Sequence, residues 1–412
     1  MSTKYKKTLM TNPLDWLAAE LQSLRDDGLL RHRREVLPSV GIASQSPGRV
    51  VVQGREVWDF ASNNYLGLAT EASVLSAAAA AIKTHGVGAK ASPLVSGRTN
   101  LHAELETALA DFEGTEAAIL FPTGMAANLG TVAALAGPSD AVFCDRLNHA
   151  SLVDGCRLSG ARLRVYRHDD LENLRKSLSR ESARRSWIVT DTVFSMDGDL
   201  APLPDLCEIA EHFGAGVIVD EAHGTGVFGQ LGRGVAELQG VEERISVRIG
   251  TLSKSIGALG GFVSGSQTLI DYLWNKARTQ IYSTALPPAL CAAATAALKV
   301  IRDEPERRHR LHALSLAFRD QLESHGVIPR AGSIGPIVPI VINDPHAAVS
   351  IAEQLLSVGF LVAAIRPPTV PAGTSRLRVT LNCELPVDVV VQLADQIARL
   401  LSGLQSVGTG EV

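Results

Sequence analysis

The middle of the chain alternates between two patterns of hydrophobic and polar positions. Several short runs are almost continuously apolar, and the segments between many of them carry apolar residues at helical spacing. Short buried strands that alternate with helices are typical of an α/β fold with a mostly parallel central sheet covered by helices on both faces. The expected strands are Ala117–Phe121, Ala141–Asp145, Leu163–Tyr166, Trp187–Thr190, Val217–Asp220, Ile245–Gly250 and Gly261–Ser264. The expected helices include His102–Phe112, Met125–Leu135, Leu171–Ser179 and Leu206–Phe213.

The two ends of the chain have a different pattern. Apolar residues at helical spacing predict a helix within Pro13–Arg34, and two short strands are expected at Val50–Val52 and Val57–Ala61. From about residue 289, long helical stretches lead to short strands, among them Leu361–Ile365, which is typical of a smaller α+β domain. We therefore expect an N-terminal helix with short strands in residues 1–60, a large domain in residues 61–288, and a small C-terminal domain in residues 289–412.

Composition narrows the classes of protein. The chain has 412 residues, 46% hydrophobic and 20% charged, with a net charge of -4, which argues against a nucleic-acid partner. The basic run Arg31–Arg34 could bind an anion or form a solvated helix face, and both interpretations stay open.

Cysteines and apolar runs bear on the location of the protein. The five scattered cysteines indicate reduced thiols in a cytoplasmic protein, and no metal site is expected. The polar segment Met1–Lys7 lacks the apolar core of a secretory signal, and no apolar run is long enough to predict a membrane span.

Two expected strands end in residues that can carry chemistry, and ligands of α/β sheets bind beyond the carboxyl ends of the strands. Asp220 ends one strand, where a buried carboxylate requires a cationic partner such as a protonated pyridine nitrogen. A role as a helix N-cap or as an ion-pair residue is an equal alternative. Lys254 follows another strand and has small or apolar neighbours. Burial would lower the pKa of its amine and suit it to Schiff-base chemistry, whereas most lysines are only surface charges.

Other strand ends give weaker signals. Gly124 opens an expected helix whose free N–H groups could bind a phosphate, but glycine is common at such turns for steric reasons alone. His149 could lie against an aromatic ring or be an ordinary core histidine. Ser195 could contact a ligand or only form a turn.

Several motifs, taken together, resemble those of the fold-type I pyridoxal-phosphate enzymes and, more narrowly, of the α-oxoamine synthases. The matching segments extend over nearly the whole chain and are Phe60–Leu68, Ser96–His102, Asn148–Ser151, Val193–Asp199, Val219–Gly226 and Gly250–Gly257. The resemblance implies a fold-type I transferase with pyridoxal 5'-phosphate as cofactor. It also implies a homodimer with the active site at the subunit interface, and a decarboxylative condensation of an amino acid with an acyl thioester.

The resemblance implies a role for each matched residue. Lys254 would hold the cofactor and later remove the Cα proton, Asp220 would pair with the pyridine nitrogen, and His149 would stack on the ring. The other cofactor contacts would be His223, Ser195, Gly124, Met125, Thr251 and, from the partner subunit, Ser283 or Thr284. The amino-acid carboxylate would bind Asn63 and Arg378, and the substrate residues would also include His149, Arg31 and Thr369.

The segment Ala364–Arg378 is most similar to the member of this family that joins L-alanine to a pimeloyl thioester, carried by coenzyme A or by acyl-carrier protein, in biotin biosynthesis. Sister enzymes stay open as alternatives: 2-amino-3-oxobutyrate CoA ligase, 5-aminolevulinate synthase and serine palmitoyltransferase. A non-catalytic relative and an aminotransferase on the same fold are further alternatives. Pro93, Met125 and Asn382–Leu385 depart from the family pattern and leave the fit of the acyl substrate open.

Overall fold

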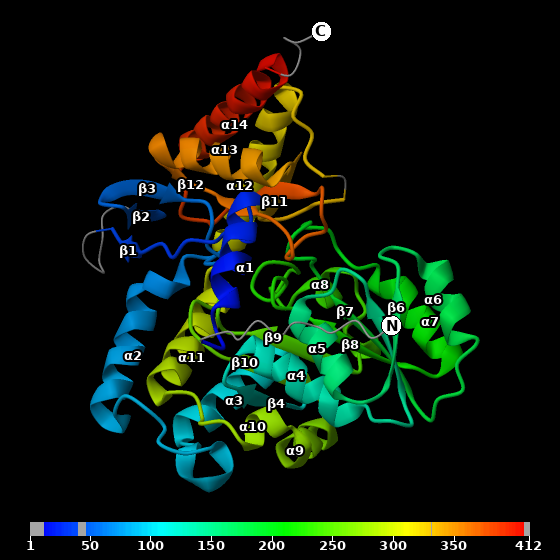
Figure 1. Ribbon diagram of the computed structural model, residues 1–412. Helices are drawn as coiled ribbons and strands as arrows, with labels where there is room; N and C mark the ends of the chain where they lie inside the picture. Colours follow the sequence, from blue (N-terminus) through cyan, green and yellow to red (C-terminus); the bar gives the residue numbers. More distant parts are fainter. Residues whose placement is uncertain (1–11, 40–46, 331, 408–412) are drawn as a thin grey trace.

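The computed structural model describes residues 12–39, 47–330 and 332–407 of the chain (Figure 1). The segment Met1–Lys7, considered above as a possible signal, lies outside these residues. No helix among the described residues is long and apolar enough to cross a membrane.

A seven-stranded sheet forms the centre of the fold, with the strand order β4-β10-β9-β8-β7-β5-β6. β10 is antiparallel to both of its neighbours, and the pairs from β9 to β6 are all parallel. The mostly parallel α/β sheet predicted from the sequence is therefore confirmed. The strands are β4 (Ala117–Phe121), β5 (Ala141–Asp145), β6 (Arg162–Tyr166), β7 (Ser186–Asp191), β8 (Gly216–Asp220), β9 (Val247–Thr251) and β10 (Gly261–Gly265).

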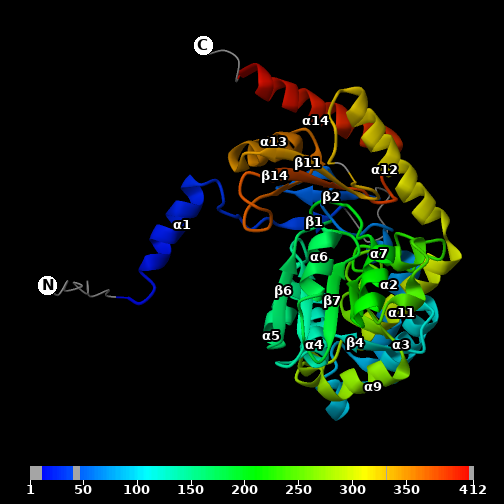
Figure 2. The same cartoon turned by 90° about the vertical axis from the view of Figure 1, so that its right-hand side faces the viewer.

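Helices cover both faces of this sheet (Figure 2). Alternate residues of each strand point to opposite faces, so Ile119 and Phe121 of β4 pack in one hydrophobic cluster whereas Leu120 packs in the other. The first cluster includes residues of α4 (Gly124–Leu135), α5 (Ala150–Leu158) and α9 (Gln267–Lys276). The second includes residues of α3 (Asn100–Glu113), α6 (Leu171–Leu178), α7 (Leu203–Phe213) and α11 (Pro288–Asp303). Burial on both faces explains why the inner strands, such as β8, are almost continuously apolar.

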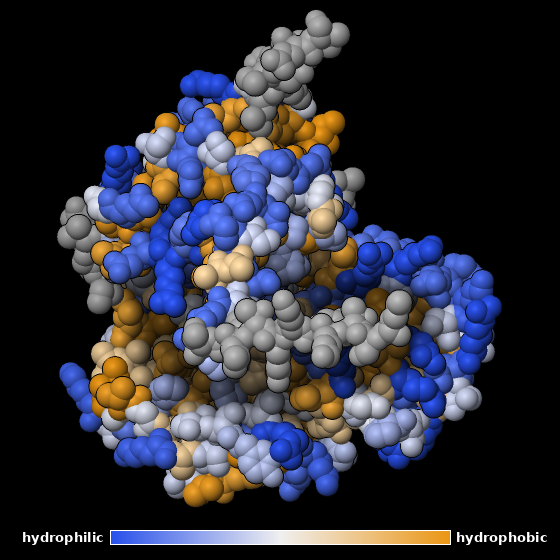
Figure 3. Space-filling view, viewed as in Figure 1, coloured by the Kyte–Doolittle hydropathy of each residue, from blue (hydrophilic) through white to orange (hydrophobic). Residues whose placement is uncertain are grey.

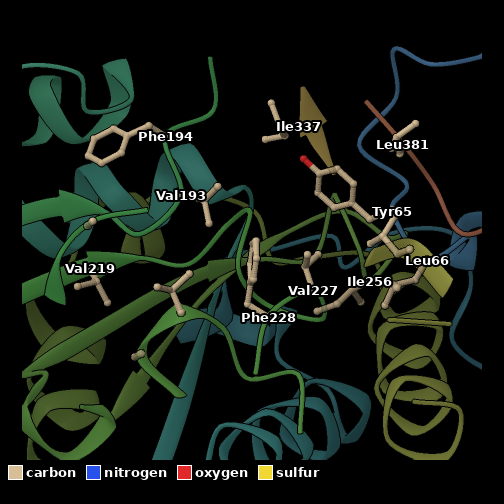
Figure 4. Packing of buried hydrophobic residues seen from close by; sticks show 14 of the residues in the cluster. Tyr65, Leu66, Val193, Phe194, Val219, Val227, Phe228, Ile256, Ile337 and Leu381 are labelled. Carbon is tan, nitrogen blue, oxygen red and sulfur yellow. The ribbon is translucent and has the colours of Figure 1, made fainter. Parts of the chain in front are cut away.

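The second cluster continues from the large sheet into the C-terminal part of the chain. Figure 4 shows Val219 of β8, Phe228 and Val227 in one row, with Tyr65, and with Ile337 and Leu381 of the C-terminal part, above them. The two parts of the chain therefore share one hydrophobic core.

The C-terminal part contains a three-stranded antiparallel sheet, β11-β14-β13. Its elements are α12 (Glu306–Ser324), β11 (Ile337–Asn343), α13 (Pro345–Ser357), β13 (Ala363–Ile365), β14 (Ser375–Thr380) and α14 (Val387–Val407). β12 (Phe360–Leu361) belongs to another sheet, where it runs parallel to β3. The expected single strand Leu361–Ile365 is therefore two strands, and the chain changes sheets between them.

N-terminal strands complete that other sheet, whose order is β1-β2-β3-β12. β1 (Val36–Pro38), β2 (Arg49–Val52) and β3 (Arg55–Asp59) follow α1 (Trp16–Asp26). α1 has no buried residue and stands away from the rest of the chain in Figure 2. It lies within Pro13–Arg34, as the apolar pattern predicts, and Gly28 after its end adopts a positive φ of 67°.

The start of α11 coincides with the predicted domain boundary near residue 289. α11 contacts α2 (Ala72–His85) and α3, so its packing lies on the side of the large domain. The division into residues 1–60, 61–288 and 289–412 stays a prediction.

The edge strand β6 is protected by charge. Arg162 and Arg164 are exposed on it and pair with Glu181 at 2.8 and 3.4 Å. Hydrophilic residues also dominate the neighbouring edge of the molecule, formed by α6 and α7, in Figure 3. Exposed charge on an edge strand opposes pairing with the strands of other molecules.

Candidate active site

Lys254 and Asp220 lie at the ends of two adjacent parallel strands. Asp220 is the last residue of β8, and Lys254 follows β9, whose Ile249 pairs with Asp220. Burial lowers the pKa of the Lys254 amine to about 8, although the carboxylates of Asp220 and Asp191 oppose this shift. An appreciable share of the amine is therefore neutral near physiological pH, as a nucleophile or a base requires.

Two neutral donors orient the Asp220 carboxylate. The Asn128 side chain donates to Oδ2 at 2.6 Å, and the Ala222 N–H donates to Oδ1 at 2.7 Å. Asp220 is buried, with only 6% of its surface exposed. Within the described part of the chain, no cationic nitrogen lies within 4.0 Å of its carboxylate oxygens. A buried carboxylate that is held in place and has no cation in direct contact fits a protonated pyridine nitrogen.

A second buried carboxyl group, Asp191, lies beside Asp220 because β7 is the neighbour of β8. Burial, and then the nearby Asp220, raise the pKa of Asp191 well above its usual value. Its Oδ2 accepts the His149 main-chain N–H at 2.6 Å. Asp191 and Asp220 thus place two carboxyl groups at the ends of neighbouring parallel strands.

His149 is the N-cap residue of α5. Its Nδ1 lies 2.6 Å from the Ser151 hydroxyl, which also accepts a hydrogen bond from Asn128 at 2.8 Å. Asn128 therefore links the predicted stacking residue His149, through Ser151, to Asp220. His149 as a residue is exposed, so it is accessible to a ligand.

His223 is buried and close to the same group of residues. Its Nδ1 lies 2.6 Å from the Tyr65 hydroxyl. Burial, with the nearby charges of Lys254 and Arg378, holds the pKa of His223 well below its usual value, and burial raises the pKa of Tyr65 to about 12. Both side chains are therefore neutral, and the imidazole can donate a hydrogen bond from one nitrogen and accept one at the other.

Arg378 in β14 connects three parts of the chain. Its guanidinium donates to the Asn63 side-chain oxygen at 3.1 Å, to the Ser195 carbonyl at 2.6 Å and to the Thr380 hydroxyl at 3.0 Å. The Tyr65 hydroxyl also donates to Asn63, at 3.2 Å. The structure therefore brings the predicted carboxylate-binding residues, Asn63 and Arg378, together with Ser195 and, through Tyr65, with His223.

The predicted phosphate-binding residues Gly124 and Met125 lie at the N-terminus of α4. The Thr123 hydroxyl caps this helix by accepting the Ala126 N–H at 3.0 Å, whereas no described acceptor receives the N–H groups of Gly124 and Met125. A Cβ atom on Gly124 would lie 3.1 Å from the Thr251 hydroxyl, so glycine keeps this corner open. Two free N–H groups at a helix N-terminus beside a hydroxyl fit a phosphate.

Three predicted residues lie apart from this group. Thr284 is exposed between α10 (Arg278–Ile281) and α11, and its expected contact across a subunit interface stays a prediction. Arg31 donates to the Pro367 carbonyl at 3.1 Å, so it lies against the segment that leads to Thr369, and both residues are exposed. Arg31 also lines a cavity of about 880 Å³ with Arg366.

Asp191, Asn128 and Tyr65 are contacts that the sequence analysis did not single out. Asp191 is a carboxylate at a strand end, the same signal that drew attention to Asp220, but the expected strand ended one residue too early. Asn128 and Tyr65 lie in segments whose predicted site residues were Gly124, Met125 and Asn63. Their importance follows from their partners in the fold.

Comparison with known proteins identifies the family of this chain. Residues 55–397 match the family described as aminotransferase class I and II. The chain is 50% identical to an 8-amino-7-oxononanoate synthase of Geobacter sulfurreducens over 89% of this chain and 92% of that protein. It is 46% identical to one of Anaeromyxobacter dehalogenans over 96% and 98% of the two chains.

Solved structures share the fold. A serine palmitoyltransferase of S. paucimobilis with pyridoxal phosphate and myriocin bound has a TM-score of 0.87 and 33% identity, over 95% of this chain and 98% of that one. An 8-amino-7-oxononanoate synthase of Francisella tularensis has a TM-score of 0.74 and 28% identity, over 85% and 99%. The cofactor is pyridoxal phosphate, which the geometry around Lys254, Asp220 and α4 fits. The chain belongs to the aminotransferase class I and II family and, within its α-oxoamine synthase branch, to the 8-amino-7-oxononanoate synthases.

Proposed function

We propose that this protein condenses L-alanine with a pimeloyl thioester to form 8-amino-7-oxononanoate in biotin biosynthesis. The reaction forms a carbon–carbon bond between the alanine Cα and the acyl carbonyl carbon. It breaks the thioester bond and the bond to the alanine carboxylate, and so releases the thiol of coenzyme A or acyl-carrier protein and carbon dioxide. The observation that carries this proposal is the Asn63–Arg378 pair close to Lys254, in a chain that is 46–50% identical to named synthases.

Arg378 and Asn63 hold the carboxylate of the amino acid in this proposal. A planar guanidinium can donate to both oxygens of a carboxylate at once. The contacts of Arg378 with the Ser195 carbonyl and Thr380 fix its plane before the substrate arrives. Binding then costs little side-chain entropy at this residue.

Lys254 is the proposed base that removes the Cα proton, and its pKa of about 8 suits it to accept a proton near neutral pH. Pyridoxal phosphate, when bound, supplies an electron sink for the negative charge that forms at Cα. Asp220 keeps the pyridine nitrogen protonated, with its carboxylate held by Asn128 and the Ala222 N–H. Gly124, Met125 and Thr251 hold the phosphate, His149 contacts the ring, and His223 and Ser195 complete the cofactor site.

Arg31 and Thr369 are the proposed contacts of the acyl substrate. They belong to two exposed segments joined by the Arg31–Pro367 hydrogen bond. The nearby cavity of about 880 Å³ is large enough for part of an extended thioester. Its four arginines outnumber its two glutamates, Glu35 and Glu353, which favours a negatively charged ligand.

The assembly and location are also proposals. We infer a homodimer in which Thr284 of one subunit reaches the phosphate of the other, as the family resemblance implies, and we infer no nucleic-acid or membrane partner. Five free cysteines, all buried, support a reducing cytoplasmic environment.

Serine palmitoyltransferase activity is the second candidate. One observation favours it: the structure of that enzyme has a TM-score of 0.87, against 0.74 for the F. tularensis synthase, and a higher identity. The higher identity to the named synthases of G. sulfurreducens and A. dehalogenans favours the first candidate.

A substrate matrix separates the two candidates. The purified holoenzyme is incubated with L-alanine, glycine or L-serine and with pimeloyl-CoA or palmitoyl-CoA, and both free thiol and product mass are measured. We expect the highest kcat/KM with L-alanine and pimeloyl-CoA. A preference for L-serine with palmitoyl-CoA, or for glycine, would overturn the proposal. A protein that binds no pyridoxal phosphate would instead support a non-catalytic role.

A further inference from the structure

A half-buried histidine, His168, lies between two carboxylates outside the site described above. It follows the edge strand β6, and its side chain is only 12% exposed. Nδ1 lies 3.2 Å from Asp145 Oδ2, and Nε2 lies 2.7 Å from Asp199 Oδ2. The edge of the ring packs on Phe194, with centroids 4.4 Å apart and an angle of 78° between the planes. His168 is thus fixed on three sides.

The contacts require a charged ring. Ionised carboxylates only accept hydrogen bonds, so both ring nitrogens must donate, and only the imidazolium has two N–H groups. Burial alone would lower the pKa of His168, but hydrogen bonds to Asp145 and Asp199 raise it to about 10. Asp169 also lies 3.3 Å from Nε2. His168, Asp169 and Asp199 are close enough together to surround a metal ion, yet an imidazolium has no lone pair to offer one.

Each of the two carboxylates belongs to a turn that carries a predicted site residue. Asp145 accepts the Leu147 N–H at 2.8 Å with its side chain and the Asn148 N–H at 3.2 Å with its carbonyl, and so shapes the turn that leads to His149. Asp199 accepts the Phe194 N–H at 3.0 Å with its carbonyl and closes the turn around Ser195.

The second turn leads directly to the proposed carboxylate site. The Ser195 carbonyl accepts a hydrogen bond of 2.6 Å from Arg378. A shift of this turn would therefore move the guanidinium that is proposed to bind the amino acid, and a shift of the first turn would move His149.

We propose that His168, bridging Asp145 and Asp199, is a positioning residue that sets the places of His149 and Arg378 without contacting cofactor or substrate. The proposal rests on the roles given to these two residues under Proposed function. It predicts that two separate properties, affinity for pyridoxal phosphate and the KM for the amino acid, depend on one distant side chain.

Substitutions at His168 test the bridge. His168→Phe keeps an aromatic ring against Phe194 and removes both donors, whereas His168→Arg retains a planar cation that can donate to two carboxylates. His212 supplies the matched control, because its ring packs on Phe213 in a similar way, at 4.6 Å and 86°, on an exposed part of α7. His212→Phe therefore removes a histidine of similar packing that bridges no carboxylates among the residues described.

The measurements are the Kd for pyridoxal phosphate, read from cofactor absorbance during titration of the apoprotein, and the KM and kcat of the holoenzyme. We expect His168→Phe to raise both Kd and KM by about tenfold, the size of one lost charge-assisted hydrogen bond, with a smaller change in kcat. His168→Arg should recover most of the loss, and His212→Phe should leave both values within twofold of the wild type.

Three results would overturn the proposal. The first is a His168→Phe protein whose Kd and KM are within twofold of the wild-type values. The second is an increase in Kd and KM no larger than that of His212→Phe, and the third is an increase that His168→Arg does not reduce. If His168→Phe does not fold, His168→Gln, which keeps one donor, takes its place with the same criteria. The Kd measurement uses no amino acid or thioester, so it tests His168 even if the wild-type enzyme fails to use L-alanine and the proposed function is wrong.

Discussion

Asp197→Asn is expected to destabilise the protein by removing the counter-ion of a buried arginine. Arg376 of β14 is only 2% exposed and donates to Asp197 and, at 3.1 Å, to the Met196 carbonyl. Removing one member of a buried pair typically costs about 3–5 kcal/mol, because the other charge stays desolvated. Arg376 would keep the carbonyl groups of Met196 and Thr374 as acceptors. We therefore expect a loss at the lower end of this range, about 3 kcal/mol.

The expected change in melting temperature follows from the length of the chain. An unfolding entropy of about 2.1 cal/mol/K per residue gives roughly 0.9 kcal/mol/K for 412 residues. A loss of about 3 kcal/mol then lowers Tm by roughly 3–4 °C. The change in free energy is measured separately, from the shift of the urea midpoint at constant m-value.

Two further variants make the test specific. Arg330 also pairs with Asp197, at 3.0 Å, but its side chain is 39% exposed, so Arg330→Met should cost less than about 1 kcal/mol. Asp197→Asn combined with Arg376→Met removes both buried charges and should be more stable than Asp197→Asn alone. The reasoning would be refuted if Asp197→Asn were no more destabilising than Arg330→Met, or if Arg376→Met added to the loss.

Three other predictions concern the site. Lys254→Met should abolish thiol release. Between about pH 8 and 10.5 only the unfolded chain keeps the Lys254 proton, so the free energy of unfolding of the wild-type apoprotein should rise with pH and that of Lys254→Met should not. Urea titrations across this pH range measure the difference, and a flat wild-type profile would contradict the prediction. Arg378→Lys should raise the KM for L-alanine at least tenfold in steady-state assays, because a lysine cannot form the three contacts; an unchanged KM would exclude it from carboxylate binding. Thr123→Ala removes the cap of α4, so it should lower the free energy of unfolding by about 1 kcal/mol in urea titration and weaken cofactor binding at this N-terminus. A variant with wild-type stability and wild-type cofactor affinity would argue against both effects.

Most of the central sheet was predictable because its strands are buried on both faces. The expected strand Ala141–Asp145 matches β5, and Ala117–Phe121 matches β4. The strand Leu361–Ile365 was wrong as a single element, because an apolar run does not reveal which sheet each half will join. Only the pairing of β12 with β3 and of β13 with β14 separates the two halves.

The site was predictable where chemistry depends on a strand end, and less so where it depends on neighbours. Lys254 and Asp220 follow apolar runs, which any reader of the sequence can find. The importance of Asp191 depends on β7 lying next to β8, and that of Tyr65 on its contact with His223, 158 residues away. Strand order and such distant contacts are properties of the folded chain and leave no local pattern.

The pairing of β3 with β12 has a consequence for the order of events during synthesis. Trp58 of β3 is aligned with Phe360 of β12, and among the strands that the structure describes β3 has no neighbours other than β2 and β12. At about 5–20 residues per second, a ribosome adds the intervening 300 or so residues in roughly 15–60 s. During that time the outer edge of β3 has no native partner, even after β10, the last strand of the large sheet along the chain, has been synthesised. The nascent chain therefore carries an open strand edge near its beginning, and native pairing closes it only when synthesis is almost finished.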